Sequence, residues 1–337
     1  MDLRFRVIAG KTAHRVIFSD IAACRRIVAD AYLAHARGHS VNPNSHFLRF
    51  PERPNARIIA LPAYLGGDAE VAGIKWIASF PDNIRRGVPR ASAVLILNDC
   101  ETGYPIACLE SSIISAARTA ASAVLAAEHL SPEGRRARRL GIVGTGLIAR
   151  YTYEFLLALG WSIDDVLLFD LNSDESARFA ATACRHDRHR SVAVVPDLPG
   201  LLRESELIVL TTVAGAPHIH DPSLLRHNPT VLHVSLRDLS PDIILGAQNV
   251  VDDVGHVLNA NTSVHLTQQR VGGTGFIAGT LADLMRGELP LRTDVPRIFS
   301  PFGLGVLDLA VGRWVLDAAV AAGEFVEIPE FFYEMTR

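Results

Sequence analysis

The sequence predicts an α/β fold in which a Rossmann-type doubly wound parallel sheet is combined with a second α+β domain. Three observations support this prediction. A glycine-rich turn stands between an apolar strand and a helix at 140–159, strands alternate with helices from 140 to 252, and successive strands without intervening helices occupy 58–109. Alternating strands and helices are typical of parallel sheets, whereas successive strands favour an antiparallel or mixed sheet.

The first 130 residues carry the elements of the second domain. We expect an irregular, partly extended entry over 1–20, a helix that Asp20 caps and that runs to about Ala36, and a polar, arginine-rich loop over 38–57. Apolar runs then predict four strands, and a helix that is small and apolar all round, and therefore buried, follows them. These strands are expected at 58–61, 71–80, 93–97 and 106–109, with a hairpin loop at 99–103, and the helix at 111–130.

The stretch 138–170 has the order of a dinucleotide-binding βαβ unit. A strand at 140–143 leads into the G-x-G-x-x-A turn 144–149, a helix follows at 148–159, and a second strand at 166–169 ends at Asp170. Gly144 permits the tight turn, and Gly146 lets backbone N–H groups at the helix N-terminus approach a pyrophosphate. Ala149 keeps the helix close to the sheet. Asp170 stands where a carboxylate accepts the ribose hydroxyls and repels a 2′-phosphate, which favours NAD over NADP.

A second copy of the motif occurs at 273–278, but the polar sequence HLTQQRVG precedes it, so we interpret it as a loop and helix entry. Apolar runs predict four more strands between 192 and 252, and the apolar helix at 305–322 is expected to return to the first domain. The predicted boundaries are 1–130 with 305–337 for a substrate-binding and dimerisation domain, and 131–304 for an NAD-binding Rossmann domain. The further strands are expected at 192–195, 207–212, 231–236 and 250–252, and a short helix at 281–287.

The composition argues against several function classes. A net charge of −3 offers no electrostatic case for nucleic acid or an anionic membrane, and no uncharged apolar run is long enough to span a bilayer. Four scattered cysteines without C-x-x-C spacing indicate a reduced, cytoplasmic protein. The histidine-rich segments 186–189 and 218–221 lack a third ligand at convincing spacing, so we expect no metal site.

Three charged residues lie in unusual places. Lys75 interrupts an apolar strand in a chain where only Lys11 and Lys75 are lysines, and it either holds a substrate carboxylate or extends to solvent. Arg118, in the buried helix, either faces an anion or forms a structural salt bridge. Asp238 follows the strand at 231–236, so it either faces the ligand crevice or serves as a turn or N-cap residue. Arg49, Arg53 and Arg57 are either solvated or line an anionic pocket.

Four segments, GIKWIASFPDN, LNDCETGYPIACLESSIISAARTAAS, LGIVGTGLIA and HVSLRDLSPD, resemble the ornithine cyclodeaminase/mu-crystallin family in family order, over about 45–320. The resemblance implies an NAD-dependent enzyme, a homodimer, and catalysis centred on Lys75 and Asp238, with Asp238 handling the substrate amine. It also implies substrate carboxylate binding by Lys75, Arg118 and either Arg49 or Arg57. The implied cofactor contacts are Gly144, Thr145, Gly146, Leu147, Ile148, Asp170, Arg118, Thr119, Thr212 and Ser235.

Within that family, SHFLRFPERPNARIIALPA and RIFSPFGLGVLDLAVG look most like the branch that oxidises N-(2-amino-2-carboxyethyl)-L-glutamate. That branch yields 2-oxoglutarate and L-2,3-diaminopropionate, a precursor of siderophores and peptide antibiotics. The chain departs from the cyclodeaminase run G-D-x-P-G-K-T-E at LRDLSPD, where Arg237 adds a cation that suits a substrate with several carboxylates. The alternatives are an ornithine cyclodeaminase, a ketimine reductase, another amino-acid dehydrogenase, or a mu-crystallin-like nucleotide-binding protein without turnover.

Overall fold

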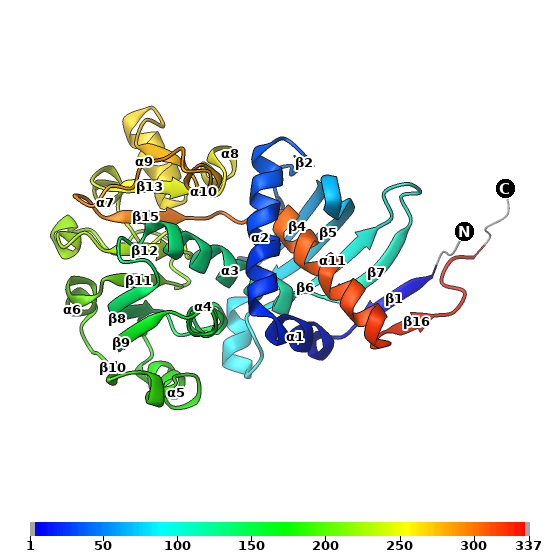
Figure 1. The fold of residues 1–337 in the computed structure, drawn as a ribbon, viewed down its shortest axis with the longest axis horizontal. Coiled ribbons are helices and arrows are strands. Elements are labelled where there is room, and N and C mark those ends of the chain that lie inside the picture. The colour runs from blue at the N-terminus through cyan, green and yellow to red at the C-terminus, as the bar shows by residue number, and fades with distance from the viewer. Residues whose placement is uncertain (1–3, 334–337) are drawn as a thin grey trace. The chain divides into compact units, whose positions relative to one another are not determined.

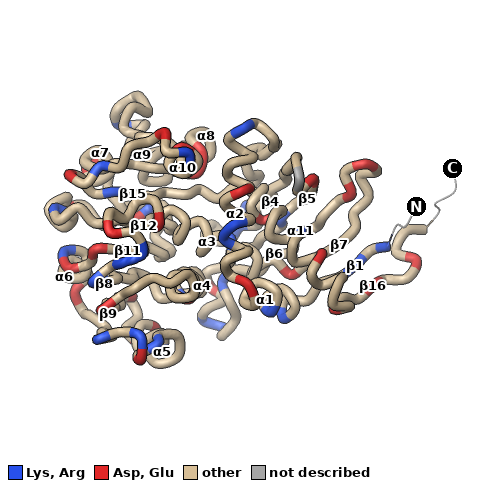
Figure 2. The backbone as a smooth tube through the Cα atoms, in the orientation of Figure 1, with Lys and Arg blue, Asp and Glu red and all other residues tan. Residues whose placement is uncertain are grey.

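The computed structural model describes residues 4–333, which fall into two compact units (Figure 1). The first unit holds the residues up to Arg118 and the segment from Leu304 on, and the second holds Thr119–Gly303. The division lies within helix α3 (Ser112–Leu130), whereas the sequence placed the boundary after this helix. Basic and acidic residues are interspersed along both units (Figure 2).

The first unit is built on a mixed sheet of eight strands in the order β16-β1-β7-β6-β5-β4-β2, with β3 paired to β4. Only the β1–β7 pair is parallel, and the other neighbours run antiparallel. The strands are β1 (Phe5–Ile8), β2 (Ser40–Val41), β3 (His46–Phe50), β4 (Arg53–Leu65), β5 (Val71–Ser79), β6 (Ala91–Asn98), β7 (Pro105–Glu110) and β16 (Val326–Ile328), and the helices are α1 (Gly10–Ser19), α2 (Ile21–Ala36) and α11 (Gly305–Ala322).

Two expectations for this unit were wrong. Residues 1–20 were expected to be irregular and partly extended, but the described part of this segment forms a regular strand, β1, and a helix, α1. Strand β1 finds its partners in the distant strands β7 and β16. The polar loop expected over 38–57 instead contains β2, β3 and the start of β4, and β3 folds back on β4 as an antiparallel hairpin. The helix after Asp20 was predicted correctly, since the Asp20 carboxylate accepts from the backbone N–H of Ala23 at 2.8 Å.

Helices of the described residues 4–333 cover one face of this sheet and leave the other open. Helix α11 packs on β4, β5 and β6, and both α1 and α2 pack against α11. On the opposite face, the strand register places Leu48, Trp76 and Val94 among apolar neighbours, and Trp76 is 42% exposed. The first unit therefore presents an apolar sheet face to its surroundings.

The second unit confirms the predicted Rossmann-type sheet. Its eight strands are all parallel, in the order β10-β9-β8-β11-β12-β15-β13-β14. Strands β14 and β15 were not predicted. The strands are β8 (Arg136–Val143), β9 (Ser162–Phe169), β10 (Ser191–Val194), β11 (Leu207–Leu210), β12 (Thr230–His233), β13 (Gln248–Val251), β14 (Ile277–Thr280) and β15 (Arg297–Ser300).

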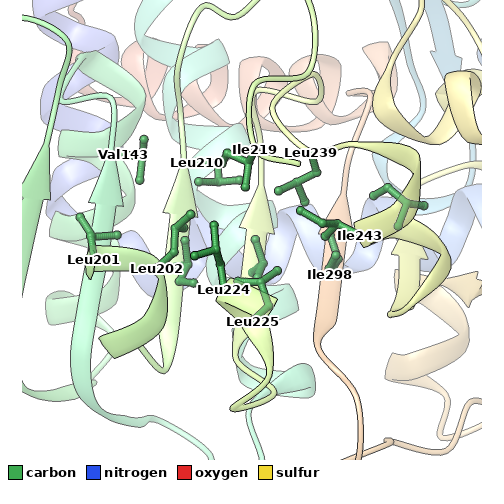
Figure 3. Packing of buried hydrophobic residues seen from close by; sticks show 13 residues of the cluster. Val143, Leu201, Leu202, Leu210, Ile219, Leu224, Leu225, Leu239, Ile243 and Ile298 are labelled. Atoms are coloured by element: carbon green, nitrogen blue, oxygen red, sulfur yellow. The ribbon is translucent and has the colours of Figure 1, made fainter. Parts of the chain in front are cut away.

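Helices connect these strands and bury the two faces of the sheet. Figure 3 shows Leu210 of β11 and Ile298 of β15 packed with side chains of helices α6 and α7, among them Leu201 and Ile243. The helices of this unit are α4 (Leu147–Ala158), α5 (Ser173–Thr182), α6 (Leu198–Glu204), α7 (Pro241–Leu245), α8 (Val254–Val257), α9 (Ser263–Val271) and α10 (Leu281–Met285). No helix of the described residues is both long and apolar enough to cross a membrane.

Candidate active site

The glycine-rich turn lies at the point where the strand order of the second sheet reverses, between β8 and β11. Gly144 has φ +84°, and a Cβ on it would lie 2.9 Å from the carbonyl group of Thr211. Only glycine combines this conformation with this close approach. In open α/β sheets, ligands bind at such a reversal, outside the carboxyl ends of the strands.

The residues after Gly144 leave room for a phosphate. A Cβ on Gly146 would meet no atom within 4 Å, and Gly146 is the N-cap of α4 without any side-chain hydrogen bond at the cap. The first N–H groups of a helix need partners, and the helix dipole favours an anion there. The turn therefore fits the pyrophosphate of a dinucleotide.

Asp170 follows the carboxyl end of β9, as predicted, and its side chain reaches back to the turn. The carboxylate accepts hydrogen bonds from the Thr145 N–H at 2.8 Å and the Thr145 hydroxyl at 3.1 Å. One residue thus orders the loop that would hold the pyrophosphate and places a negative charge where a ribose would lie. Of the other predicted cofactor contacts on this turn, Leu147 is exposed and Ile148 is half-buried.

Asp238 lies at the centre of a buried hydrogen-bonded cluster. It is 0% exposed, so it is neither a solvated turn residue nor a helix cap, since Ser240 caps α7. Its Oδ1 accepts from the hydroxyl of Thr212 and lies 3.1 Å from His218 Nε2, and its Oδ2 accepts from the hydroxyl of Ser235. The structure therefore brings three predicted residues, Thr212, Ser235 and Asp238, into direct contact.

The Asp238 carboxylate is held in its ionised form. Burial alone would raise its pKa, but hydrogen bonds and charge from His233, together with the Ser235 and Thr212 hydroxyls, hold the pKa well below its usual range. His233 Nε2 lies 3.3 Å from Oδ2 and 3.1 Å from the backbone nitrogen of Asp238. Asp238 is thus an anion at neutral pH despite its burial.

Arg237, next to Asp238, has a partner within the chain. Its Nε and Nη2 donate to the carbonyl of Ala260 at 3.1 and 2.8 Å. This contact spans the loop before α9, in which Ala260 and Asn261 have φ of 54° and 52°. The structure gives Arg237 a role in holding this loop, and substrate binding by Arg237 stays a prediction.

In the first unit, Lys75 and Arg118 share one carboxylate. Lys75 Nζ lies 2.6 Å from Asp308 Oδ2 and 3.2 Å from the Ser115 hydroxyl, and Arg118 Nε lies 3.2 Å from Asp308 Oδ1. Lys75 is 2% exposed, so it does not extend to solvent. Two cationic side chains and one carboxylate leave an excess of positive charge in this buried group.

The electrostatics of Lys75 follow from this crowding. Burial, and then the positive charge of Arg118, lower its pKa from 10.5 to about 8, against the opposing charge and hydrogen bond of Asp308. An arriving carboxylate would stabilise the protonated lysine. The arrangement can therefore bind an anion at neutral pH.

A second cationic group lies on the same face of the first sheet as Lys75. In the strand register, Arg49 of β3 lies opposite Arg57 of β4, and Arg57 lies opposite Ser79 of β5. The Ser79 hydroxyl accepts a hydrogen bond from Arg90 Nη1 at 2.7 Å. Burial, then the charge of Arg49, lowers the pKa of Arg57, and burial, then the charge of Arg57, lowers the pKa of Arg90. Among the described residues none of the three arginines forms an ion pair, and Arg57 Nε is buried without a hydrogen-bond partner.

Sequence reasoning missed several residues of these groups, among them Asp308, Arg90 and His218. Asp308 is a carboxylate in the apolar first turns of α11, the same kind of signal that singled out Arg118, but its partner Lys75 lies 233 residues away. Arg90 lies directly before β6 in a polar segment and gives no sequence signal. His218 was considered only as part of a metal-like cluster, and the described residues hold no group of three or more metal-ligating side chains.

The sequence matches the model of the ornithine cyclodeaminase/mu-crystallin family over residues 11–323. It is 31% identical, over 87% of the chain and 88% of the relative, to N-((2S)-2-amino-2-carboxyethyl)-L-glutamate dehydrogenase of Staphylococcus aureus. The structure is similar to Δ1-pyrroline-2-carboxylate reductase of Thermococcus litoralis in complex with NADH and L-proline, with a TM-score of 0.88, 22% identity and coverage of 96% and 100% of the two chains. An archaeal alanine dehydrogenase dimer with bound NAD superposes with a TM-score of 0.85, 23% identity and coverage of 98% and 100%.

Proposed function

The chain belongs to the ornithine cyclodeaminase/mu-crystallin family, as its sequence motifs predicted, and from this membership we propose its reaction. It is an NAD-dependent oxidoreductase that acts on a CH–NH group. Its substrate is N-(2-amino-2-carboxyethyl)-L-glutamate, which it cleaves to 2-oxoglutarate and L-2,3-diaminopropionate. Two observations support this substrate. The chain is 31% identical to a dehydrogenase that is named after this compound, and the first unit has a matching distribution of positive charge. A role in siderophore or peptide-antibiotic precursor supply rests on that product.

One observation carries the choice of substrate: the first unit has two cationic groups on one sheet face. Lys75 belongs to the first group, and Ser79, which lies opposite Arg57, marks the second. Lys75 and Ser79 are four positions apart on β5, so the backbones of the two groups are about 13 Å apart along the strand. The long lysine and arginine side chains can bring the charged atoms of the two groups closer together than their backbones. A substrate with several carboxylates suits both groups, whereas alanine, ornithine and proline, with one carboxylate each, suit only one.

The residues of the chain supply position and charge for this reaction. Lys75 and Arg118 would hold one carboxylate, and Arg57 with Arg49 and Arg90 would hold another. NAD, held by the turn at Gly144–Gly146 and by Asp170, supplies the hydride acceptor. The cluster around Asp238 would manage the protons of the substrate nitrogen and of the water that hydrolyses the imine.

The test is NADH formation, followed at 340 nm, with N-(2-amino-2-carboxyethyl)-L-glutamate, ornithine, alanine and glutamate supplied in parallel with NAD. We expect absorbance to rise with the first compound and 2-oxoglutarate to appear in equal amount. Proline formed from ornithine, or NADH formed only with alanine, would contradict the proposed substrate and assign the chain another reaction of its family.

Arg90 provides a sharper test of the second cationic group. We expect Arg90→Gln and Arg57→Gln to raise KM for the proposed substrate by about tenfold or more, because each removes a charge-assisted hydrogen bond to a carboxylate. Arg86→Gln, an exposed arginine on the segment before β6, is the matched control and should leave KM unchanged. An Arg90→Gln variant with the KM of the wild type would remove the second cationic group from the proposed site.

We also propose that the chain forms a homodimer through the uncovered sheet face. The apolar side chains there, Leu48, Trp76 and Val94, form a patch on strands β3, β5 and β6, and a related fold occurs as a dimer. Trp76→Glu should convert the dimer to a monomer in sedimentation velocity, and Glu52→Gln, an exposed change outside this patch, should not. A wild-type chain that sediments as a monomer at micromolar concentration would refute this assembly.

A further inference from the structure

The buried position of Asp238 limits what it can do itself. Both carboxylate oxygens are engaged: Oδ1 contacts Thr212 and His218, and Oδ2 contacts Ser235 and His233. The side chain is 0% exposed. A base that exchanges protons with a substrate must come within about 3 Å of it, directly or through one water. A fully enclosed carboxylate with four neighbours is poorly placed for that exchange.

His218 has the properties that Asp238 lacks. Its side chain is 39% exposed, and one ring nitrogen, Nε2, lies 3.1 Å from Asp238 Oδ1. Among the described residues the ring has no other partner, so Nδ1 is available. An ionised carboxylate at Nε2 selects the tautomer that keeps its proton there, which leaves Nδ1 as a proton acceptor.

The backbone fixes His218 against the same aspartate. The N–H groups of His218 and Ile219 both donate to the carbonyl of Asp238, at 3.0 and 2.9 Å, and Ile219 bridges to Leu239. The segment 218–219 is thereby held beside 238–239, so the side-chain contact does not depend on a flexible loop. His233, the other histidine of the cluster, is 0% exposed and cannot take over this role.

We propose that His218 is the side chain that exchanges protons with the substrate, and that Asp238 is a positioning residue that orients and charges the His218 imidazole. This inference rests on the proposed function and identifies its proton carrier. The chemistry it serves is the oxidation of a secondary amine followed by hydrolysis of the resulting iminium ion.

The proton steps balance with one imidazole. The substrate Cα–H bond breaks, its electron pair leaves as hydride for NAD, and a C=N bond forms. Water then adds to that carbon while its proton passes to His218 Nδ1. His218 returns this proton to the nitrogen as the C–N bond breaks, and the hydroxyl proton leaves to solvent as the carbonyl forms. The net products are a ketone, a primary amine, NADH and one proton.

The first experiment compares His218→Asn with His220→Asn, an exposed histidine two residues away that serves as the matched control. We expect His218→Asn to lower kcat by about 10²–10³-fold while the dissociation constant of NAD and the Tm stay unchanged. His220→Asn should behave as the wild type. Wild-type kinetics in His218→Asn would overturn the inference.

The second experiment needs no substrate and follows the ring tautomer of His218 by nitrogen NMR, with its resonances assigned by their absence in His218→Asn. We expect the wild-type ring to carry its proton on Nε2 and Asp238→Asn to remove this preference, because an amide can donate to Nε2 where the carboxylate only accepts from it. An unchanged tautomer would refute the role of Asp238. The two proposals fail separately: a chain that oxidises alanine instead of the proposed substrate contradicts the substrate, yet still tests His218 on the amine it does oxidise.

Discussion

Replacing Lys75 with methionine should raise stability while it destroys substrate use. Methionine keeps the length and most of the volume of lysine but carries no charge. In the wild type, the protonated lysine is buried between Arg118 and Asp308, and its pKa is lowered from 10.5 to about 8. Without Lys75, the single positive charge of Arg118 faces the single negative charge of Asp308. The variant therefore keeps a balanced ion pair.

The magnitude follows from linkage between protonation and folding. The difference between 10.5 and about 8 corresponds to about 3 kcal/mol, and Lys75 is 2% exposed, so solvent screens little of it. Below pH 8 the lysine is protonated in both states, so the whole cost weighs on the folded state. Between pH 8 and 10.5 only the unfolded chain keeps the proton, so the wild type gains stability as pH rises.

The assay is urea unfolding of wild type and Lys75→Met at several pH values from 7 to 10. The comparison between the two chains is essential, because buried thiols such as Cys24, whose pKa burial raises to about 12, change stability in the opposite direction over the same range. We expect the stability of the variant relative to wild type to fall by about 2–3 kcal/mol from pH 7 to pH 10. A difference that is independent of pH would refute the reasoning. A large loss of stability at pH 7 would show instead that Lys75 supports the fold.

Three further predictions test other parts of the structure. Gly146→Val should abolish NAD binding, measured by calorimetry, without lowering Tm, because a Cβ at this position meets no other atom of the protein. Gly144→Ala should instead lower the free energy of unfolding by about 1–2 kcal/mol, because the backbone there has a φ of +84°. Equal losses of Tm in the two variants would contradict this contrast. Asp308→Asn should cost about 3–5 kcal/mol in urea unfolding at pH 7, because it leaves Arg118 and Lys75 without their shared anion, and a loss below about 1 kcal/mol would mean that the pair is solvated. A thiol reagent should modify the exposed Cys100 first and the buried Cys24 only on unfolding, and Cys100→Ser should remove the fast phase; a fast phase that survives would place the reactive thiol elsewhere.

The elements that the sequence predicted well are those whose signals are local. The G-x-G-x-x-A turn, helix α4 and strand β9 lie within about thirty residues of one another, and the hydrophobic pattern specifies each of them. Strands β5, β6 and β7 were predicted for the same reason. Strand β3 was missed because its histidine and arginine, in a polar segment, suggested a loop, and only its pairing with β4 makes it a strand.

The candidate site was predictable as single residues but not as groups. Lys75, Arg118 and Asp238 stood out because a charge in an apolar segment needs a partner. The partner of the first two, Asp308, is 190 residues or more away in the chain, so no spacing rule links them. The enclosure of Asp238 by Thr212, Ser235 and His218 likewise depends on the loops that follow two strands, β11 and β12, and periodicity does not describe loops.

The separation between Lys75 and Asp308 also bears on how the protein is made. The second unit, Thr119–Gly303, is one continuous stretch, so all of its strands have been synthesised before Asp308 is. Because the chain leaves the ribosome from its N-terminus, this unit can fold while Asp308 is still inside the ribosome, so that Lys75 lacks its carboxylate and β4, β5 and β6 lack the helix that covers them. The lysine pocket is therefore completed last, after translation of α11. Any shortened product that stops before this helix would leave the ribosome with a formed nucleotide domain and an unfinished, aggregation-prone sheet.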